Sequence, residues 1–212
     1  MTASAASLKV AGTVPLTTVD FPGELALTVF MQGCPWACPY CHNAALRALD
    51  APGGPAWERV LAMVRERREF IGAVVFSGGE PTLQAGLAHA LRDVRALGLR
   101  TGLHTAGPFP DRLRAVLPLL DWVGLDVKAP FDERYAQLTG DPDAAGRVRE
   151  SLVAVRESGV ALQLRSTVSA DADGDARFAE IGRQLAEMGA PAPVRQTLRL
   201  VPAEYRQPEV MP

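Results

Sequence analysis

The sequence predicts an α/β fold in which six parallel strands alternate with helices. Short apolar or β-branched runs are followed by longer segments whose apolar residues recur at helical spacing. Gly98, Gly159 and Gly189 each follow such a segment, as is typical of helix ends. Repeated strand–helix units favour right-handed crossovers and a parallel sheet. Because only about ten residues follow the sixth strand, we expect either an open six-unit partial barrel or a doubly wound sheet, and not a closed eight-unit barrel.

The periodicity assigns each element in order along the chain. The predicted strands are residues 25–31, 73–76, 101–105, 122–127, 160–168 and 194–201. The predicted helices are residues 56–70, 85–97, 111–119, 144–158 and 175–188, with one short helical turn near Glu133. We expect a single domain over residues 1–212, with a core of residues 24–201 and with peripheral segments 1–23 and 202–212.

Composition excludes several classes of protein. The chain has 22 Lys and Arg residues against 24 Asp and Glu residues, a formal charge of −2. A protein that binds nucleic acid through phosphate neutralisation would carry a basic excess, so we expect no nucleic-acid partner. No apolar run approaches the roughly 18 residues of a membrane helix. Residues 1–8 do not resemble a secretory signal, and the sequence therefore favours a cytoplasmic protein without a membrane partner.

The three cysteines of the chain, Cys34, Cys38 and Cys41, lie within eight residues of one another. An odd number of cysteines in one loop cannot form a disulfide framework, and their thiols indicate a reducing compartment. Thiolates at this spacing can each bind a different iron of a cubane cluster. Three ligands would leave one iron open for a substrate. A structural zinc site formed by the three cysteines and His42 is the alternative.

Polar residues gather where the predicted strands end, which is where parallel βα folds place their functional groups. They are Ser77 to Pro81, His104, Thr105, Asp126, Lys128, Gln163, Arg165 and Thr167. Strand side chains alternate between faces, so Asp126 and Lys128 share one face. Buried charges of both signs persist only when they are paired or bind a polar ligand. We therefore expect an interior that suits a zwitterion with an amino group and a carboxylate.

Two motifs at these strand ends resemble a known family. Cys34, Cys38, Tyr40 and Cys41 match the C-x3-C-x-aromatic-C pattern of the radical S-adenosylmethionine (SAM) superfamily. The segment Gly78-Gly79-Glu80 matches its second signature. The resemblance implies a partial (β/α)6 radical-SAM-type barrel with parallel strands, in agreement with the strand count.

Further segments narrow the resemblance to the glycyl-radical-enzyme activases. They are Asp20-Phe21-Pro22-Gly23, Gln32-Gly33-Cys34, Cys41-His42-Asn43 and Asp126-Val127-Lys128. Among activases, the chain is most similar to the activating proteins of anaerobic ribonucleoside-triphosphate reductase. The resemblance covers roughly residues 17–167.

The resemblance assigns expected roles to individual residues. Cys34, Cys38 and Cys41 would hold a [4Fe–4S] cluster whose open iron binds the amino and carboxylate groups of SAM. Gly78, Gly79 and Glu80 would bind the methionyl amino group, and Tyr40 would contact the adenine. The other expected SAM-binding residues are Thr105, Asp126, Lys128 and Arg165, with Arg165 as the partner of the SAM carboxylate.

The resemblance also implies an activity and its partners. Reductive cleavage of SAM would release methionine and a 5′-deoxyadenosyl radical, which would take a hydrogen atom from a glycine of a glycyl radical enzyme. The expected partner is the large subunit of anaerobic ribonucleotide reductase, and the electron donor would be a low-potential protein such as flavodoxin or ferredoxin. Two alternatives stay open. One is another small radical SAM enzyme acting on a nucleoside or peptide, and the other is a non-catalytic zinc scaffold.

Two features are left undecided by the sequence. Some activases have an acidic residue before the threonine at the end of the third strand, where a monovalent cation binds, but this chain has His104. His104 is therefore either a site residue or a histidine satisfied within the interior. Arg195 and Arg199 share a face of the last predicted strand, where both ligand contact and solvation of the sheet edge are compatible with the pattern.

Overall fold

A computed structural model describes residues 8–198 and shows one seven-stranded sheet. The strands follow one another across the sheet in chain order. They are β1 (Val10–Thr17), β2 (Ala26–Met31), β3 (Ala73–Gly78), β4 (Arg100–Thr105), β5 (Trp122–Asp126), β6 (Ala161–Val168) and β7 (Val194–Thr197). Strands β2 to β7 are parallel, as the sequence predicts, and β1 is antiparallel to β2. The carboxyl ends of six strands therefore meet at one rim.

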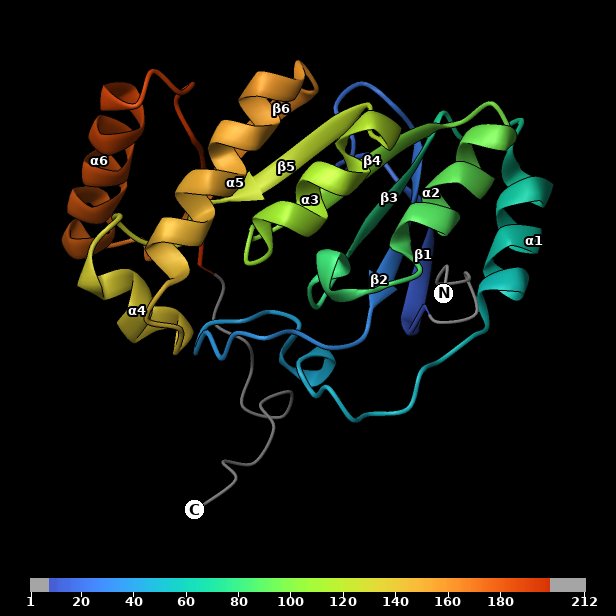
Figure 1. Cartoon of the computed structure of the whole chain (residues 1–212), viewed down its shortest axis with the longest axis horizontal. Helices are drawn as coiled ribbons and strands as arrows, with labels where there is room; N and C mark the ends of the chain where they lie inside the picture. Colours follow the sequence, from blue (N-terminus) through green and yellow to red (C-terminus); the bar gives the residue numbers. More distant parts are fainter. Residues whose placement is uncertain (1–7, 199–212) are drawn as a thin grey trace.

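The helices lie on the outer face of this sheet (Figure 1). They are α1 (Trp57–Arg67), α2 (Leu87–Ala96), α3 (Pro110–Val116), α4 (Glu133–Thr139), α5 (Ala144–Ser158) and α6 (Ala172–Glu187). Short 3₁₀ turns are formed by Ala44–Leu46, Pro81–Leu83 and Leu117–Leu119. A sheet in chain order with helices on one face is a partial barrel, and this arrangement excludes the doubly wound alternative.

The two faces of the strands bury different side chains. Leu27, Val29, Phe76 and Leu125 belong to the large apolar core shared with the helices. On the inner face, Phe21 forms a separate small cluster with four barrel residues, Ala26, Ala73, Val75 and Trp122. A Cβ atom at Gly102 would lie 2.9 Å from the Phe21 ring, so glycine leaves room for this ring. Phe21 thus fills the amino end of the barrel and leaves the carboxyl end hollow.

Strand β1 was not predicted from the sequence. It lies in residues 1–23, which we expected to be peripheral, and it forms an edge of the sheet. Gly12 and Pro15 interrupt its alternation, and its pairing with β2 shifts register twice. Proline is tolerated at sheet edges because the missing N–H is not needed there. The sequence therefore lacks the clean alternation by which a strand is recognised.

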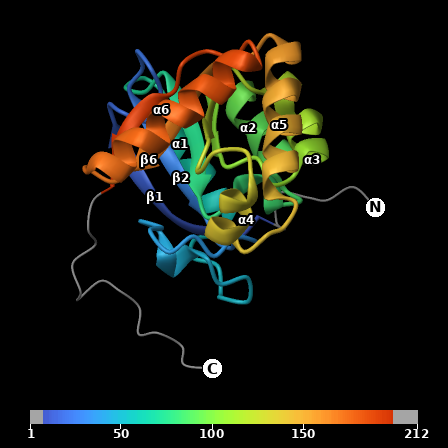
Figure 2. The same ribbon diagram turned by 90° about the vertical axis from the view of Figure 1, so that its left-hand side faces the viewer.

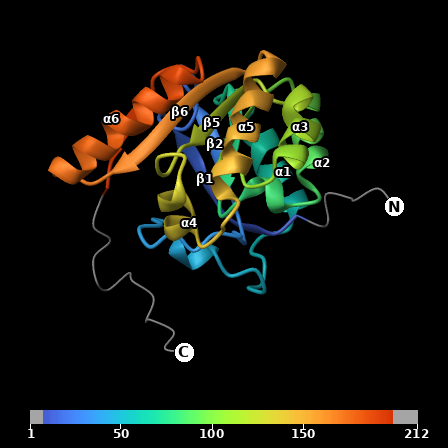
Figure 3. The same cartoon turned by 60° about the vertical axis from the view of Figure 1, so that its left-hand side comes forward.

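The remaining boundaries differ by only a few residues from those predicted. The sixth predicted strand, residues 194–201, is observed over Val194–Thr197, and residues 199–201 lie outside the described part of the chain. Helix α6 begins at Ala172 and lies beside β6 (Figures 2 and 3). No helix among residues 8–198 is long and apolar enough to span a membrane.

Candidate active site

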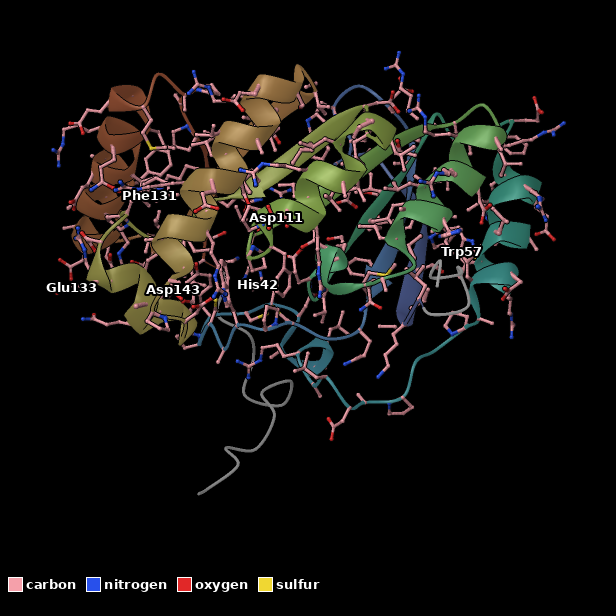
Figure 4. All side chains as sticks on the ribbon, viewed as in Figure 1. His42, Trp57, Asp111, Phe131, Glu133 and Asp143 are labelled. Atoms are coloured by element: carbon pink, nitrogen blue, oxygen red, sulfur yellow. The ribbon has the colours of Figure 1, made fainter. Side chains whose placement is uncertain are left out.

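A cavity of about 390 Å³ opens at the carboxyl ends of the parallel strands. All three cysteines line it, together with Tyr40 and His42 from the same loop. The facing walls come from the strands and their ends, through Ser77, Gly78, Gly79, His104, Thr105, Ala106, Asp126, Lys128, Arg165, Thr167 and Gln196. His42 is labelled in Figure 4, at the level of the loop that crosses below the strand ends. The cavity joins the residues that the sequence placed on one rim.

The loop that carries the cysteines, residues 33–50, is held by its own backbone and by residues around it. The N–H groups of Gly33 and Cys34 donate to the carbonyl oxygens of Leu46 and Arg47, at 2.8 and 3.1 Å. The Arg47 side chain donates to the carbonyl oxygen of Cys38 at 3.4 Å. These contacts hold the loop in a closed conformation beside the cavity.

Helix α4 and its C-terminal turn support the outer side of this loop. The indole N–H of Trp36 donates to the Asp141 carboxylate at 3.1 Å, and the Ala37 N–H donates to the Thr139 carbonyl at 3.0 Å. Trp36 is 3% exposed and packs edge-on against Tyr135, with ring centroids 6.1 Å apart. Trp36 therefore anchors the loop and also lines the cavity.

The Gly78-Gly79 turn packs directly against the start of the cysteine loop. Gly79 N–H donates to the Met31 carbonyl at 2.9 Å. A Cβ atom at Gly79 would lie 2.2 Å from the Gly33 carbonyl oxygen, and one at Gly78 would lie 2.5 Å from the Met31 nitrogen. Gly78 also has a φ of 105°, which favours glycine. The absence of side chains at both positions is required by the protein's own backbone.

Glu80 is placed differently from the sequence-based expectation. Its side chain is 1% exposed and does not line the cavity. Its carboxylate accepts hydrogen bonds from Thr105 Oγ1 at 2.7 Å, from the Ala106 N–H at 3.0 Å, and from both the N–H and the hydroxyl of Thr82. Burial raises the pKa of Glu80, although these hydrogen bonds oppose the effect. Glu80 therefore fastens the end of β4 to the turn after β3, and Gly78, Gly79 and Thr105 face the cavity instead.

The opposite wall is a network of charged side chains. Arg165 Nε donates to Asp126 Oδ1 at 2.9 Å, and Nη2 lies 2.8 Å from the same oxygen atom in a salt bridge. Lys128 Nζ lies 3.6 Å from Asp126 Oδ2. Burial acts to raise the pKa of Asp126, but the two cations outweigh it and the pKa lies below its ordinary value. The predicted common face of Asp126 and Lys128 is thus observed, and the wall holds two cations around one carboxylate.

The thiols fit a cluster better than a single metal ion. Burial raises the pKa of Cys34 to about 12, so the free thiol is protonated and becomes a thiolate only when it binds a metal. Within residues 8–198, no three His, Cys, Asp or Glu side chains form a group that could hold one metal ion. A cubane binds each thiolate at a different iron, so its ligands need not converge on one point. The donor set therefore suits a [4Fe–4S] cluster, and the described geometry does not support the Cys3His zinc alternative.

Most of the predicted site residues come together in this cavity. Tyr40 reaches the strand wall, where its hydroxyl donates to the Lys128 carbonyl oxygen at 3.5 Å, and burial raises its pKa to about 12. Arg195 does not line the cavity, because it pairs with Asp175 and donates to the Ser169 carbonyl. Arg199 lies outside the described residues.

Val19, Asp20 and Gln196 also line the cavity, and the sequence did not predict this. Val19 and Asp20 follow the unpredicted β1, so their position could not be inferred from the strand count. Gln196 accepts a hydrogen bond from Thr167 Oγ1 at 3.0 Å. The sequence pattern around Gln196 predicts its position only weakly, because β7 is short and fully exposed.

The comparison with protein families agrees with this geometry. A family model described as the Radical SAM superfamily matches residues 28–168. A Methanocaldococcus jannaschii protein described, by inference, as a glycyl-radical enzyme activating enzyme is 34% identical over 127 residues, 58% of this chain and 52% of its own. The pyruvate formate-lyase-activating enzyme of Clostridium pasteurianum is 33% identical over 157 residues, 71% of this chain and 64% of its own.

Other similarities have a different substrate or show the fold alone. A PqqA peptide cyclase of Xanthomonas campestris is 34% identical over 163 residues, 72% of this chain and 41% of its own. The chain thus spans less than two thirds of the length of these curated relatives. A solved structure of anSMEcpe with bound AdoMet covers 79% of this chain and 49% of its own, with a TM-score of 0.64 and 18% identity. This similarity confirms the partial barrel.

Proposed function

The chain belongs to the radical SAM superfamily, and from this premise we propose that it is an activase that generates a glycyl radical on a partner enzyme. Members of this superfamily use a [4Fe–4S] cluster and SAM, which are therefore its cofactors. One observation carries the proposal: a single cavity has three thiols on one wall and a cation–carboxylate network on the other. Similarity to two activating enzymes supports the glycyl-radical class.

In this proposal each wall of the cavity has a separate task. Cys34, Cys38 and Cys41 hold the cluster, which supplies the electron for reductive cleavage of SAM when both are bound. The strand wall binds the zwitterionic end of SAM, because Arg165 and Lys128 attract a carboxylate and Asp126 attracts an amino group. Tyr40, which is half-buried beside Lys128, offers an apolar surface to the adenine.

The chain's own residues also limit access of water. Trp36 and the backbone contacts of the cysteine loop close the cavity below the strand ends. Val19 lines the cavity and is 84% exposed, so the cavity is open to solvent on this side. We propose that the glycine-bearing loop of the partner covers this opening, which would bring its glycine to the cofactor and exclude solvent.

The partner is proposed to be the large subunit of anaerobic ribonucleotide reductase. Support comes from the sequence segments Asp20 to Gly23 and Cys41 to Asn43, both of which contribute residues to the cavity. A low-potential flavodoxin or ferredoxin is proposed as the electron donor, since cleavage of SAM consumes one electron per event.

The test is an anaerobic reconstitution with iron and sulfide, followed by reduction with dithionite. The protein should become brown and convert SAM to 5′-deoxyadenosine and methionine. Adding the candidate reductase should then produce a glycine-centred radical in the electron paramagnetic resonance spectrum. SAM cleavage without any glycine radical, tested with several glycyl radical enzymes, would reject the activase proposal.

A second candidate is a peptide-modifying radical SAM enzyme. The similarity to PqqA peptide cyclase favours it, since this match covers 72% of the chain. The same reconstituted protein distinguishes the two candidates. A peptide-modifying enzyme would change the mass of a peptide substrate, whereas an activase leaves a persistent radical on a folded partner.

A further inference from the structure

His104 lies between the strand wall and the segment that precedes β2. Its Nδ1 and Nε2 atoms are 2.7 and 3.4 Å from Arg165 Nη1, and its Nε2 atom is also 2.8 Å from the carbonyl oxygen of Asp20. A guanidinium group only donates hydrogen bonds and a carbonyl oxygen only accepts them. The Asp20 carbonyl therefore requires a proton on Nε2, and in the neutral ring this leaves Nδ1, the nitrogen nearer to Arg165, as the acceptor.

We propose that neutral His104 is a positioning residue for SAM, because it orients the Arg165 guanidinium towards the cavity. The inference rests on the proposed function, since it assigns the SAM-binding role to Arg165. His104 itself is not proposed to react. Its task is to accept one hydrogen bond that decides where the remaining donors of Arg165 point.

The hydrogen bonds of Arg165 show how this orientation is achieved. The guanidinium has five N–H donors. Nε donates to Asp126, Nη2 lies in a salt bridge with the same carboxylate oxygen, and Nη1 donates to His104. The other N–H groups of Nη1 and Nη2 can donate to a ligand, and Arg165 lines the cavity. Without an acceptor at position 104, Asp126 alone would hold the group, and its Nη1 edge would be free to turn.

Neighbouring residues make room for this arrangement. A Cβ atom at Gly124 would lie 3.1 Å from the Arg165 Cζ atom and 2.6 Å from the Trp122 ring. The His104 ring packs edge-on against Trp122, with centroids 5.1 Å apart. Glycine at position 124 therefore leaves room for the Arg165 guanidinium and for the Trp122 ring on which His104 packs.

The charges around His104 favour its neutral form. Arg165 on β6 faces it directly, Asp126 on β5 lies beyond Arg165, and Asp20 precedes β2. Burial and the Arg165 cation lower the pKa of His104, while the Asp20 carbonyl contact and the two carboxylates oppose this. A proton on Nδ1 would place a second cation against Arg165 and remove its acceptor. Binding of SAM should therefore weaken as the pH falls through this lowered pKa.

His104 also connects the cavity to the segment around Phe21, which fills the amino end of the barrel. Asp20, whose carbonyl oxygen accepts the Nε2 proton, lies between the exposed Val19 and the buried Phe21. Its carboxylate accepts a hydrogen bond from Thr28 Oγ1 at 2.8 Å. His104 is thus hydrogen-bonded to a segment that is held by the Asp20–Thr28 contact and by the buried Phe21. Such support is expected of a residue that fixes the position of another side chain.

Two substitutions separate positioning from packing. His104→Asn keeps an oxygen acceptor for Arg165, whereas His104→Phe keeps an aromatic ring against Trp122 and removes both hydrogen bonds. His89→Asn, on α2 and outside the cavity, is the matched control. The dissociation constant of SAM is measured by equilibrium dialysis for each cluster-loaded variant between pH 5 and pH 8. Near-ultraviolet circular dichroism confirms that each variant is folded.

We expect His104→Phe to raise this constant by about 10- to 100-fold, as for loss of a hydrogen bond to a charged group. His104→Asn should stay within about threefold of the parent, since its amide oxygen still accepts from Arg165. The SAM affinity of the parent should weaken at low pH, whereas the SAM affinity of His104→Asn should not. Unchanged SAM affinity in folded His104→Phe would overturn the proposal.

A second measurement needs neither cluster nor SAM. Long-range ¹H–¹⁵N spectra of the three histidines in the apoprotein, assigned with His104→Asn, should show an unprotonated Nδ1 at His104. A proton on Nδ1 at neutral pH would also overturn the proposal. If the parent protein carries its cluster but binds no SAM, the proposed function fails instead, so the two failures are distinguishable.

Discussion

The two walls of the cavity are built in different ways. The cysteine wall comes from one continuous loop, and it is positioned by backbone hydrogen bonds and by the close approach of Gly79 to Gly33. The strand wall comes from β4, β5 and β6, and it is positioned by contacts among His104, Asp126 and Arg165. The loop therefore depends on the absence of side chains at a few positions, whereas the strand wall depends on charge balance.

The largest expected effect comes from removing a thiol on the loop wall. Cys38→Ala should abolish stable cluster binding and reduce SAM cleavage by more than about 100-fold, because even loss of groups outside the ligand set of a metal costs 10- to 100-fold. Iron and sulfide content and 5′-deoxyadenosine formation are the measurements. Pro39→Ala, in the same loop but outside the cavity, should retain both. Full cluster content in Cys38→Ala would contradict the assignment.

The next effect tests the backbone contact of the loop wall. Gly79→Ala should destabilise the protein by about 3 kcal/mol, because its Cβ would collide with the Gly33 carbonyl and no rotamer can relieve a backbone clash. Gly146→Ala, on α5, has no atom within 4 Å of the added Cβ and should be neutral or stabilising. Urea denaturation of the apoproteins measures both. Equal stability of the two variants would show that the turn can move away from the loop.

A smaller effect is expected on the strand wall. Asp126→Asn leaves Arg165 and Lys128 without their shared carboxylate and should cost about 1–3 kcal/mol. This free-energy cost is lower than the cost of breaking a fully buried ion pair, since the Asp126 side chain is 30% exposed. Asp143→Asn, which removes a surface pair with Arg147, is the control and should change stability by less than about 1 kcal/mol. Denaturation midpoints that do not differ between the two variants would argue against a charge-dependent wall.

The smallest expected effect is a pH dependence of the same wall. The pKa of Asp126 is lowered, so its carboxylate stabilises the folded protein fully above its unfolded pKa of about 3.9. That stabilisation is lost as the pH falls below this value and through the lowered pKa. The difference in unfolding free energy between the parent and Asp126→Asn should thus narrow as the pH falls below about 4. A constant difference would mean that Asp126 does not titrate in this range.

The contrast between the walls also explains what the sequence could predict. The three cysteines are recognisable as candidate cluster ligands because they lie within eight residues of one another. The parallel strands are recognisable because their apolar runs are regular. The common face of Asp126 and Lys128 followed from strand alternation alone. The partial barrel was therefore predicted well, apart from β1, whose Gly12 and Pro15 break the alternation.

Other features depend on contacts between distant residues. The network between Arg165 and His104 joins residues 61 positions apart, and strand alternation indicates neither distance nor tautomer. Glu80 was expected to bind SAM, but its four hydrogen bonds to Thr82, Thr105 and Ala106 form only after β3 and β4 have come together. Gly79 lines the cavity, but its close contact with the backbone at Gly33 could not be inferred from the motif. Such contacts are tertiary, and a local motif does not contain them.

The central claim is that one cavity brings a cysteine-bound cluster and SAM together. The most direct test is the electron paramagnetic resonance spectrum of the anaerobically reconstituted, dithionite-reduced protein with and without SAM. We predict a [4Fe–4S]⁺ signal whose g values change when SAM is added, and no such signal in Cys38→Ala. A cluster signal that saturating SAM leaves unchanged, or a protein that binds no iron–sulfur cluster, would contradict the account.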